Sequence, residues 1–330
     1  MVSTEQPLCG PRKTLTPRKT RTLIRLRAVS FVIQATWAAE DFEVVEKRAP
    51  VSQTSTSWGL GRISNTNPGN TTYTYDDSAG SNTCSYIIDT GIYTAHPDFE
   101  GRATFLANFA GDGSNNDGHG HGTHVAGTVG SKTYGVAKKT KLFAIKVLSN
   151  SGAGSTSGVM AGINFAANDA KSRGCAKGAV ANLSLGGSKS SALNTAVARA
   201  VANGLFVVVA AGNAATDASN TSPASEATAF TVGATDSSDQ FASFSNFGAS
   251  VDILAPGVSI ISTSNTGGTQ IKSGTSMATP HVAGLAAYLL SLEGKRSPSD
   301  LAARIAALAQ KNRITGVPSG TSNLLISNRV

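Results

Sequence analysis

Residues 205–213 read Leu-Phe-Val-Val-Val-Ala-Ala-Gly-Asn, an apolar run that ends in a glycine and an amide. Aliphatic residues occupy both alternating faces of this run, which is the pattern of a strand buried on both sides between helices. Three more runs share this character, at residues 84–88, 142–147 and 179–185. Segments with apolar residues at helical spacing lie between or after these runs, at residues 158–170, 192–203 and 277–292. This alternation predicts an α/β fold, with a doubly wound, mostly parallel sheet and helices on both faces.

The composition fits a large globular domain. Of the 330 residues, 40% are apolar and 15% are charged, and the net charge is +8. The cations of the globular part are scattered and do not form a basic stripe with interleaved aromatic residues, which argues against nucleic-acid binding. No apolar run approaches the ~18 residues that a membrane helix needs, which argues against a membrane protein.

The N-terminal segment differs from the rest of the chain. Residues 1–36 are rich in Thr, Arg and Lys and have no apolar periodicity, so we expect a disordered leader of uncertain origin outside the fold. Arg25 and Arg27 interrupt its apolar patches. The segment therefore lacks the ~7–15 unbroken apolar residues of a secretion signal.

Asp89 is the first candidate for chemistry. It directly follows the run at 84–88 and precedes a Thr-Gly turn. Ligands of a doubly wound sheet gather at the carboxyl ends of its strands, so a carboxylate there is well placed to act on one. Aspartate is also common as a turn or cap residue, and Asp89 alone therefore indicates little.

Three histidines follow in the segment His119-Gly120-His121-Gly122-Thr123-His124. They could form a metal cluster, or one of them could be a general base at the start of a helix. Their spacing does not match the two ligands, four residues apart with an intervening Glu, that are typical of zinc hydrolases. The spacing favours a general base.

Ser276 lies in Ser-Gly-Thr-Ser-Met-Ala-Thr-Pro-His, residues 273–281, at the start of the longest apolar helix. Free N–H groups at a helix N-terminus favour an anion that develops beside the serine, although a serine there can also be a simple N-cap. We expect Pro280 in the first turn of this helix, where its missing N–H costs nothing.

Together these residues indicate nucleophilic catalysis. A serine nucleophile needs a neutral base and a carboxylate that orients the base, and Asp89, His121 and Ser276 supply these groups in that order. Acyl transfer also needs donors aimed at the developing oxyanion. Asn213, which follows a strand run through a glycine, is the expected donor beside the Ser276 N–H group.

These segments resemble the subtilase family, and within it the proteinase K-like branch common in fungi, over residues 58–330. The resemblance implies a secreted serine endopeptidase in which Asp89 orients the base His121. Ser276 is then the nucleophile and Asn213 the oxyanion donor, while His119 and His124 have supporting roles. The motifs that carry the resemblance are Asp-Thr-Gly (89–91), His-Gly-Thr-His-Val-Ala-Gly (121–127), Ala-Ala-Gly-Asn (210–213) and Gly-Thr-Ser-Met-Ala-Thr-Pro-His-Val-Ala-Gly (274–284).

The resemblance also implies how substrates bind. A protein or peptide substrate is expected to add as a β-strand between residues 152–154 and 184–186, mostly through backbone hydrogen bonds, so that specificity is broad. The pocket for the P1 side chain has small or apolar walls, which predicts a preference for aromatic or aliphatic P1 residues. The predicted substrate-binding residues are Gly152, Ala153, Gly154, Ser184, Leu185, Gly186, Ala210 and Gly212.

The resemblance further implies a structural calcium ion and no catalytic cofactor. Asp252 and the carbonyl groups of Ala227 and Ala229 match the family's strong site and are the hard oxygen donors that Ca²⁺ prefers. A weaker second site has a clear match only at Thr66, and its acidic partner is missing.

The cysteines match the family in part. Cys84 and Cys175 correspond to one family disulfide, and Phe230 stands where a cysteine of another would be. Val125 replaces the free cysteine that relatives carry near the base. We therefore expect that thiol reagents do not act through the active site.

At the N-terminus the family carries a secretion signal and a propeptide that assists folding and inhibits the enzyme. Residues 37–50 resemble the tail of such a propeptide, with processing near Lys47-Arg48, which leaves residues 51–330 as the peptidase domain. We expect an extracellular monomer. The alternatives are a catalytically silent binder or antigen with the same fold, and a metal-dependent hydrolase that uses the three histidines.

Overall fold

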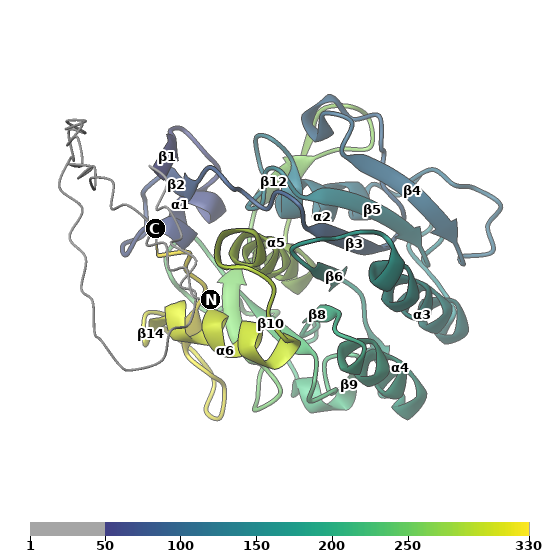
Figure 1. The fold of residues 1–330 in the computed structure, drawn as a ribbon. Helices are drawn as coiled ribbons and strands as arrows, with labels where there is room; N and C mark the ends of the chain where they lie inside the picture. The colour runs from purple at the N-terminus through teal and green to yellow at the C-terminus, as the bar shows by residue number, and fades with distance from the viewer. Residues whose placement is uncertain (1–49, 330) are drawn as a thin grey trace, which may run out of the picture. The chain divides into compact units, whose positions relative to one another are not determined.

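A nine-stranded sheet forms the middle layer of the fold (Figure 1). The computed structural model describes residues 50–329, so the expected leader and all but the last residue of the expected propeptide tail lie outside the described residues. The strand order is β14-β15-β11-β10-β8-β6-β3-β5-β4, and all neighbours are parallel except β14 and β15. The strands are β3 (Cys84–Asp89), β4 (Ala103–Asn108), β5 (Lys141–Lys146), β6 (Ala179–Leu183), β8 (Phe206–Ala210), β10 (Phe230–Thr235), β11 (Ile253–Pro256), β14 (Gln310–Lys311) and β15 (Leu324–Leu325).

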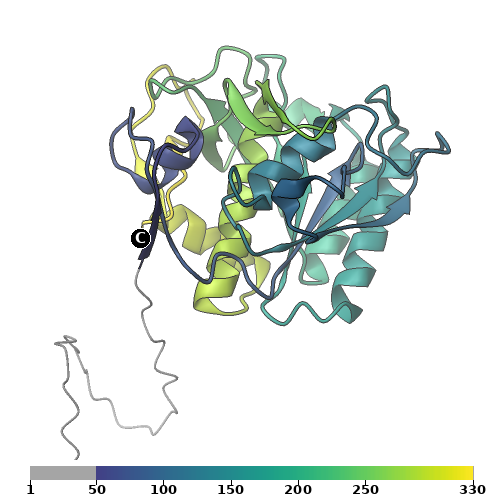
Figure 2. The same ribbon diagram turned by 90° about the horizontal axis from the view of Figure 1, so that it is seen from above.

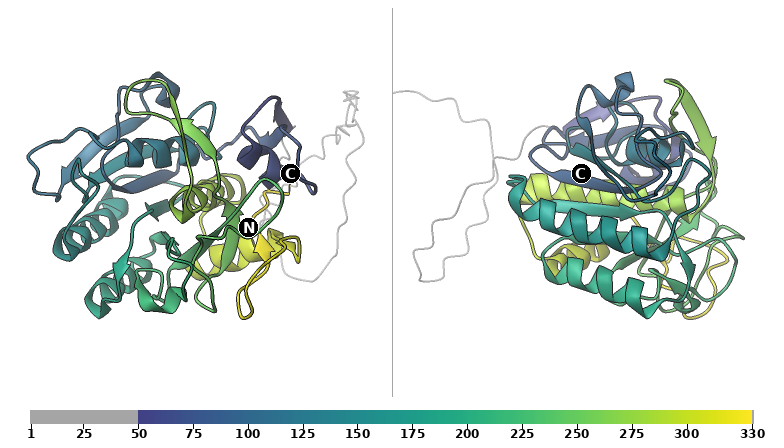
Figure 3. Two further views of the ribbon diagram at one scale, coloured as in Figure 1. Left: turned by 180° about the vertical axis from the view of Figure 1, so that it is seen from behind. Right: turned by 90° about the vertical axis from the view of Figure 1, so that its right-hand side faces the viewer.

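Helices cover both faces of the sheet. On one face α3 (Thr156–Ser172) and α4 (Ser191–Ala202) lie side by side, as Figure 3 shows, and bury one apolar cluster against the strands. On the other face α2 (His121–Gly130) and α5 (Thr275–Glu293) pack together over a second, larger cluster. The predicted doubly wound α/β fold is confirmed.

Smaller elements surround these layers. The hairpin of β12 (Ile260–Thr263) and β13 (Thr269–Lys272) lies over α2 (Figure 2). The helix α6 (Pro298–Leu308) contacts α5. The remaining elements are β1 (Pro50–Gln53), α1 (Trp58–Ser64), β2 (Tyr73–Asp76), η1 (Pro97–Phe99), β7 (Gly187–Ser188), η2 (Ala218–Asn220) and β9 (Thr221–Ser222). None of the helices within residues 50–329 has the length and apolar character needed to cross a membrane.

The position of Pro280 differs from the expectation. The helix α5 begins at Thr275, so Pro280 is its sixth residue and lies beyond the first turn. Without an N–H group, Pro280 cannot donate to the carbonyl oxygen four residues earlier, that of Ser276. The Ser184 hydroxyl donates to this oxygen over 2.8 Å and replaces the missing helical hydrogen bond. The helix thus tolerates the proline because a neighbouring strand end supplies the donor.

The sheet changes its winding direction at β3. From β3 the chain adds β4 and β5 on one side, and then crosses to add β6, β8, β10 and β11 on the other. Such a reversal leaves a crevice at the carboxyl ends of the two strands that flank it, here β3 and β6. Asp89 ends β3 and Ser184 directly follows β6, so both lie at this crevice.

The disulfide expected from the resemblance is present. Cys84 and Cys175 are bonded, with Cα atoms 5.6 Å apart. The bond joins the start of β3 to the segment that follows α3, on the α3 side of the sheet and at the end of β3 opposite to Asp89.

Candidate active site

Asp89 and His121 form a buried hydrogen-bonded pair. The His121 Nδ1–H group donates to Asp89 Oδ1 over 2.7 Å, and the Asp89 side chain is fully buried. Burial lowers the pKa of His121, but the negative charge of Asp89 and its hydrogen bond raise it more, so the pKa lies above its usual value. The pair fixes the proton on Nδ1, which leaves Nε2 as the atom that can accept one.

Asp117, which the sequence analysis did not single out, organises the backbone around this pair. Its carboxylate accepts hydrogen bonds from the Thr90 hydroxyl (2.8 Å), from Gly120 N–H (2.7 Å) and from the N–H and hydroxyl of Thr123 (2.8 and 2.6 Å). The Thr90 hydroxyl in turn accepts from Gly122 N–H over 2.9 Å. Asp117 therefore connects the end of β3 to the first turn of α2.

A glycine permits the close approach of these two elements. A Cβ atom on Gly122 would collide with the Gly91 carbonyl oxygen and lie 3.2 Å from the Cβ atom of Asp89. Any larger residue would push α2 away from the end of β3. The glycine that follows His121 is thus required for its hydrogen bond to Asp89.

Ser276 is the second residue of α5, and its side chain is half-buried. In this structure its hydroxyl donates to the Ser184 carbonyl oxygen over 3.2 Å, while the Ser184 hydroxyl donates to the Ser276 carbonyl oxygen. This reciprocal contact fixes the first turn of α5 against the end of β6. The backbone N–H group of Ser276 lies in the turn that has no intrahelical acceptors.

Asn213 is exposed and follows β8, and its amide is oriented by Thr275. Both the N–H (2.8 Å) and the hydroxyl (2.9 Å) of Thr275 donate to Asn213 Oδ1, so the Nδ2 amino group is left as the outward donor. A Cβ atom built on Gly274 would lie 3.5 Å from Asn213 Nδ2 and 3.6 Å from Ser276 N. These two donors therefore flank the same small space beside Gly274.

Asn246 shapes the loop that carries Asn213, and the sequence analysis missed it as well. Its fully buried side chain donates to the Ala211 carbonyl oxygen (2.9 Å) and accepts from the N–H groups of Ala214 and Thr216. Gly212 adopts φ +107°, and a Cβ atom there would collide with Asn246. The Ala-Ala-Gly-Asn motif accounts for the glycine, but no local signal identifies a partner more than 30 residues away.

A cleft of about 660 Å³ lies beside the pair of Asp89 and His121. His121 lines it together with both predicted substrate segments, at residues 152–154 and 184–186. Its apolar lining includes Leu148, Val159 and Leu193, and among the described residues no aspartate, glutamate, lysine or arginine side chain lines it. Ala210 and Gly212 do not line this cleft; Ala210 is buried and Gly212 is half-buried.

The three histidines have different surroundings. His119 is exposed, lines the cleft, and has its ring 6.1 Å from that of His121. His124 is fully buried under the β12–β13 hairpin, where its Nε2 lies 2.9 Å from the Ile260 carbonyl oxygen and 3.0 Å from that of Gln270. Burial lowers the pKa of His124 to about 4, which keeps the ring neutral. His124 therefore holds the β12–β13 hairpin on α2.

The predicted calcium ligands lie away from the cleft. Asp252 precedes β11, and its Oδ2 accepts a hydrogen bond from Thr231 N–H over 2.7 Å. Burial raises the pKa of Asp252 to about 6, against the lowering effect of that hydrogen bond. Ala227 and Ala229 belong to the loop before β10, which the Thr231 hydroxyl also holds through the Ala224 carbonyl oxygen.

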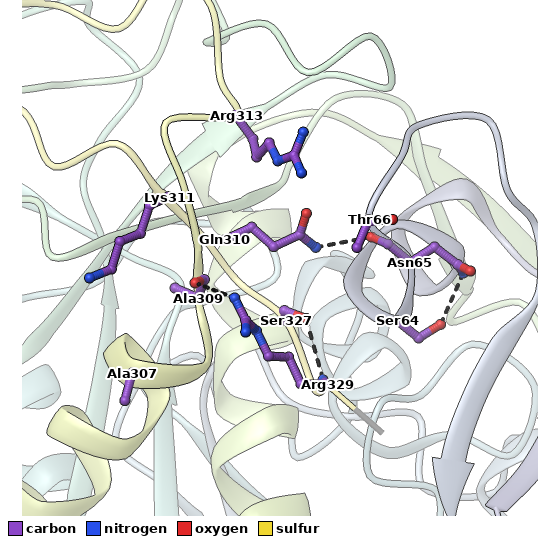
Figure 4. Close-up of a pocket in the computed structure, with 10 residues that line it drawn as sticks. All are labelled: Ser64, Asn65, Thr66, Ala307, Ala309, Gln310, Lys311, Arg313, Ser327 and Arg329. Atoms are coloured by element: carbon purple, nitrogen blue, oxygen red, sulfur yellow. Dashed lines mark hydrogen bonds between the residues drawn. The ribbon is translucent and has the colours of Figure 1, made fainter.

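A second cavity of about 710 Å³ surrounds Thr66 (Figure 4). Lys311, Arg313 and Arg329 line it, and no carboxylate side chain within residues 50–329 does. In Figure 4, Lys311 and Arg313 point in different directions, and Arg329 points to the Ala309 carbonyl oxygen, to which it donates. These cationic walls disfavour a calcium ion at Thr66, in line with the missing acidic partner.

A buried Asp–His pair, a serine at a helix N-terminus and an outward amide at the crevice of a doubly wound sheet define a class of hydrolase that uses a serine nucleophile. Comparison with known proteins narrows this class. The Subtilase family pattern (Peptidase_S8) matches residues 80–323. The chain belongs to the subtilase family, in its proteinase K-like branch, and is a serine-type endopeptidase.

Individual relatives are similar over most of their length. The chain is 60% identical to proteinase T of Parengyodontium album over 290 residues, which cover 87% of this chain and 98% of that protein. It is 59% identical to the cuticle-degrading protease of Metarhizium anisopliae over 276 residues, or 84% of this chain and 71% of the relative. Among solved structures, a cold-adapted subtilisin-like serine proteinase matches with a TM-score of 0.80 and 42% identity, over 84% of this chain and all of the other.

Proposed function

We propose that this endopeptidase cleaves peptide bonds through an acyl-enzyme, with Asp89, His121 and Ser276 as its catalytic residues and Asn213 as an oxyanion donor. The observation that carries the proposal is the 2.7 Å hydrogen bond from His121 to the buried Asp89, at the edge of a cleft that both predicted substrate segments line. The motifs that contain these four residues supply the order and the chemical types that the reaction requires.

The reaction begins with a rotation of the Ser276 hydroxyl, which leaves the Ser184 carbonyl oxygen and turns towards His121. Serine Oγ attacks the carbonyl carbon of the substrate while its proton passes to Nε2 of His121. The negative charge on the carbonyl oxygen is stabilised by Ser276 N–H and Asn213 Nδ2. His121 then gives the proton to the leaving amine, and a water molecule activated in the same way hydrolyses the acyl-enzyme.

Substrate selection follows from the walls of the cleft. Ala153, Gly154 and Gly186 are exposed, so a substrate in extended conformation can reach their backbone groups as an added β-strand. The described part of the chain places apolar side chains and no aspartate, glutamate, lysine or arginine in the cleft lining, which favours apolar substrate side chains, and we propose a preference for aromatic or aliphatic residues at P1. Protein and peptide substrates of broad sequence are then accepted.

A structural calcium ion fits the surroundings of Asp252. Its carboxylate is largely withdrawn from water, and within residues 50–329 no cationic side chain forms an ion pair with it. Such a carboxylate is stabilised by a bound cation. Asp252 and the carbonyl oxygens of Ala227 and Ala229 would hold the ion, which would connect the loop before β10 to the start of β11 without taking part in bond cleavage.

We further propose an extracellular monomer that matures from a precursor. The relative from Metarhizium anisopliae is named a cuticle-degrading protease, and the resemblance to the family implies secretion. Residues 37–50 would be the end of a propeptide that assists folding and inhibits the mature enzyme, with cleavage near Lys47-Arg48.

Replacement of the nucleophile tests the proposal. We expect Ser276→Ala to lower kcat by at least ~10³-fold while the fold is retained, because the hydroxyl makes one hydrogen bond, to the Ser184 carbonyl oxygen, which is worth about 1 kcal/mol. Ser273→Ala, three residues earlier, is the matched control, since the Ser273 hydroxyl accepts from Ser259 N–H outside the cleft.

The same experiment identifies the reacting atom. A phosphonyl fluoride should inactivate the wild type and the control, and mass spectrometry should locate one phosphonyl group on Ser276. A Ser276→Ala variant that keeps more than a few per cent of wild-type turnover would remove the assignment. Inactivation by brief zinc chelation, with no labelling of Ser276, would favour the metal-dependent alternative.

A further inference from the structure

Lys146 is a fully buried lysine at the edge of the candidate active site. It ends β5, and in the parallel pairing of β3 and β5 it lies directly beside Asp89. Its Nζ donates to the carbonyl oxygens of Thr90 (2.8 Å) and Leu148 (2.9 Å) and to Asn150 Oδ1 (3.0 Å). Three donors therefore meet three acceptors, which is the full capacity of an ammonium group.

A carboxylate compensates the buried charge. Asp112 Oδ2 lies 3.2 Å from Lys146 Nζ, and the Asp112 side chain is 15% exposed. Its partial burial opposes ionisation, but hydrogen bonds from Asn108 and Ser114 and the charge of Lys146 lower the pKa of Asp112 to about 2. Asp112 also accepts from Asn150 N–H over 3.0 Å, so it holds the same turn that Lys146 holds.

The hydrogen bond from Lys146 to the Thr90 carbonyl oxygen connects Lys146 to the proposed catalytic pair. Thr90 directly follows Asp89, and its hydroxyl connects Asp117 to Gly122 in the first turn of α2. A contact that fixes the Thr90 carbonyl thus holds the residue that directly follows the proposed catalytic carboxylate and whose hydroxyl contacts the first turn of α2.

The hydrogen bonds from Lys146 to Leu148 and Asn150 connect it to the proposed substrate-binding segment at residues 152–154. Leu148 lines the cleft, and Asn150 belongs to the turn closed by the hydrogen bond from Ser149 N–H to the Ala153 carbonyl oxygen (2.7 Å). Asn150 Oδ1 also accepts from Gly118 N–H over 3.0 Å, in the loop that leads to His121. The turn at residues 149–153 is the base from which residues 152–154 extend along the cleft.

We propose that Lys146 is a positioning residue that sets the distance between the catalytic pair and the substrate strand, so that one ammonium group aligns both for the same peptide bond. This inference rests on the proposed function, because it takes Asp89 and residues 152–154 in the roles given above. Displacement of reacting groups by about 1 Å can cost ~10²-fold in rate, so a buried group that joins the two sides can control turnover without contact to the substrate.

Lys146→Met tests this role, since methionine keeps the apolar length of the side chain and removes the ammonium group. Lys138→Met is the matched control: Lys138 is also buried, and its Nζ donates to the Lys132 and Thr133 carbonyl oxygens, but none of these residues lines the cleft. Two substrates are compared for each variant, an extended peptide that covers P4 to P1 and a single-residue ester. Rates are normalised to the active sites counted with the phosphonyl fluoride.

We expect Lys146→Met to lower kcat by about 10- to 100-fold with both substrates, and to raise KM severalfold for the extended peptide alone. Lys138→Met should lower thermal stability and leave both constants within about twofold of the wild type. If Lys146→Met does not yield folded enzyme, Asp112→Asn keeps one of the two acceptor oxygens and removes the compensating charge, and it should raise KM for the peptide relative to the ester.

The outcomes separate the two proposals. The inference is overturned if kcat and KM of Lys146→Met stay within twofold of the wild type on both substrates, because Lys146 then has a purely structural role. The same criterion applies to Asp112→Asn if only that variant folds. The roles proposed for the catalytic residues would be unaffected in that case. Their failure would appear separately, as activity in Ser276→Ala.

Discussion

Asp89→Asn is the substitution that examines the proposed mechanism most directly. Asp89 Oδ1 accepts from His121 Nδ1–H and from Thr90 N–H, each over 2.7 Å, and Oδ2 is buried without a partner among the described residues. Asparagine has the same size, but an amino group at the Oδ1 position would lose the bonds from both His121 and Thr90. It loses the negative charge, and it places an amino group where one of the carboxylate oxygens was.

The expected loss of rate follows from this geometry. When an amino group faces His121 Nδ1, the ring is stable only with its proton on Nε2, and that atom can no longer accept the proton of Ser276. A wrong tautomer of this kind costs about 10⁴-fold in kcat, or about 5.4 kcal/mol in activation free energy at 1.36 kcal/mol per factor of ten. KM should change little, because Asp89 is fully buried and does not line the cleft.

The pH dependence of activity provides a second test of the role of Asp89. Activity needs neutral His121, so the wild type loses activity as pH falls through the pKa of His121. Burial lowers this pKa and Asp89 raises it above its ordinary value. Asp89→Asn removes the raising interaction and keeps the burial, so the pKa should fall. The residual activity of the variant should therefore persist to lower pH than that of the wild type.

The assay is kcat/KM against pH for the wild type, Asp89→Asn and the control Asp169→Asn. Asp169 pairs with Arg173 and Tyr86 on the α3 side of the sheet, so its loss tests the general effect of an amide at a carboxylate site. An Asp89→Asn variant within tenfold of the wild-type kcat, or one with its acidic limb moved to higher pH, would refute the role assigned to Asp89.

Two further predictions concern the oxyanion donor and the calcium ion. Asn213→Ala should lower kcat by ~10²–10³ with little change in KM in steady-state assays on a peptide amide, because the Nδ2 group of Asn213 is proposed to act on the transition state. A dominant rise in KM would instead make Asn213 a binding residue. For calcium, the raised folded-state pKa of Asp252 means that this group's contribution to the stability of the ion-free protein is fully present below about pH 4 and is lost as pH rises through about 6. At pH 8, calcium at a hundredfold excess over its Kd should add about 2.7 kcal/mol to the free energy of unfolding of the wild type. The gain should appear as a higher Tm that a chelator reverses, and Asp252→Asn should not show it. An equal effect of calcium in both proteins would place the ion elsewhere.

The sequence predicts the strands and helices that are apolar on a regular period, because burial on both faces leaves a strong local signal. The runs at 84–88 and 205–210 appear as β3 and β8 with ends that differ by one residue. The short pairs β7–β9 and β12–β13 were not predicted, since two to four residues carry too little pattern.

The site was predictable only in part. The motifs around Asp89, His121, Ser276 and Asn213 predict the groups that we propose to react, because the proposed chemistry demands those residue types. Asp117, Asn246 and Lys146 are ordinary polar residues in sequence. Their importance depends on partners that folding brings to them, such as Ala211 for Asn246 at a separation of 35 residues, and no local pattern encodes such contacts.

The charges around His121 explain why its surroundings suit a base that becomes a cation during the reaction. Asp89 is fully buried and Asp117 is 5% exposed, and the negative charges of both act to raise the pKa of His121. The positive charge of Lys272 acts in the opposite direction but does not outweigh the other effects, and the charge of Lys146 is paired with Asp112. When His121 takes the proton of Ser276, the new positive charge therefore meets fixed negative charges that no solvent has to reorganise, and this lowers the barrier. Asp117→Asn would remove one of these negative charges and leave the tautomer of His121 unchanged. The two aspartates therefore act on different properties of the same ring.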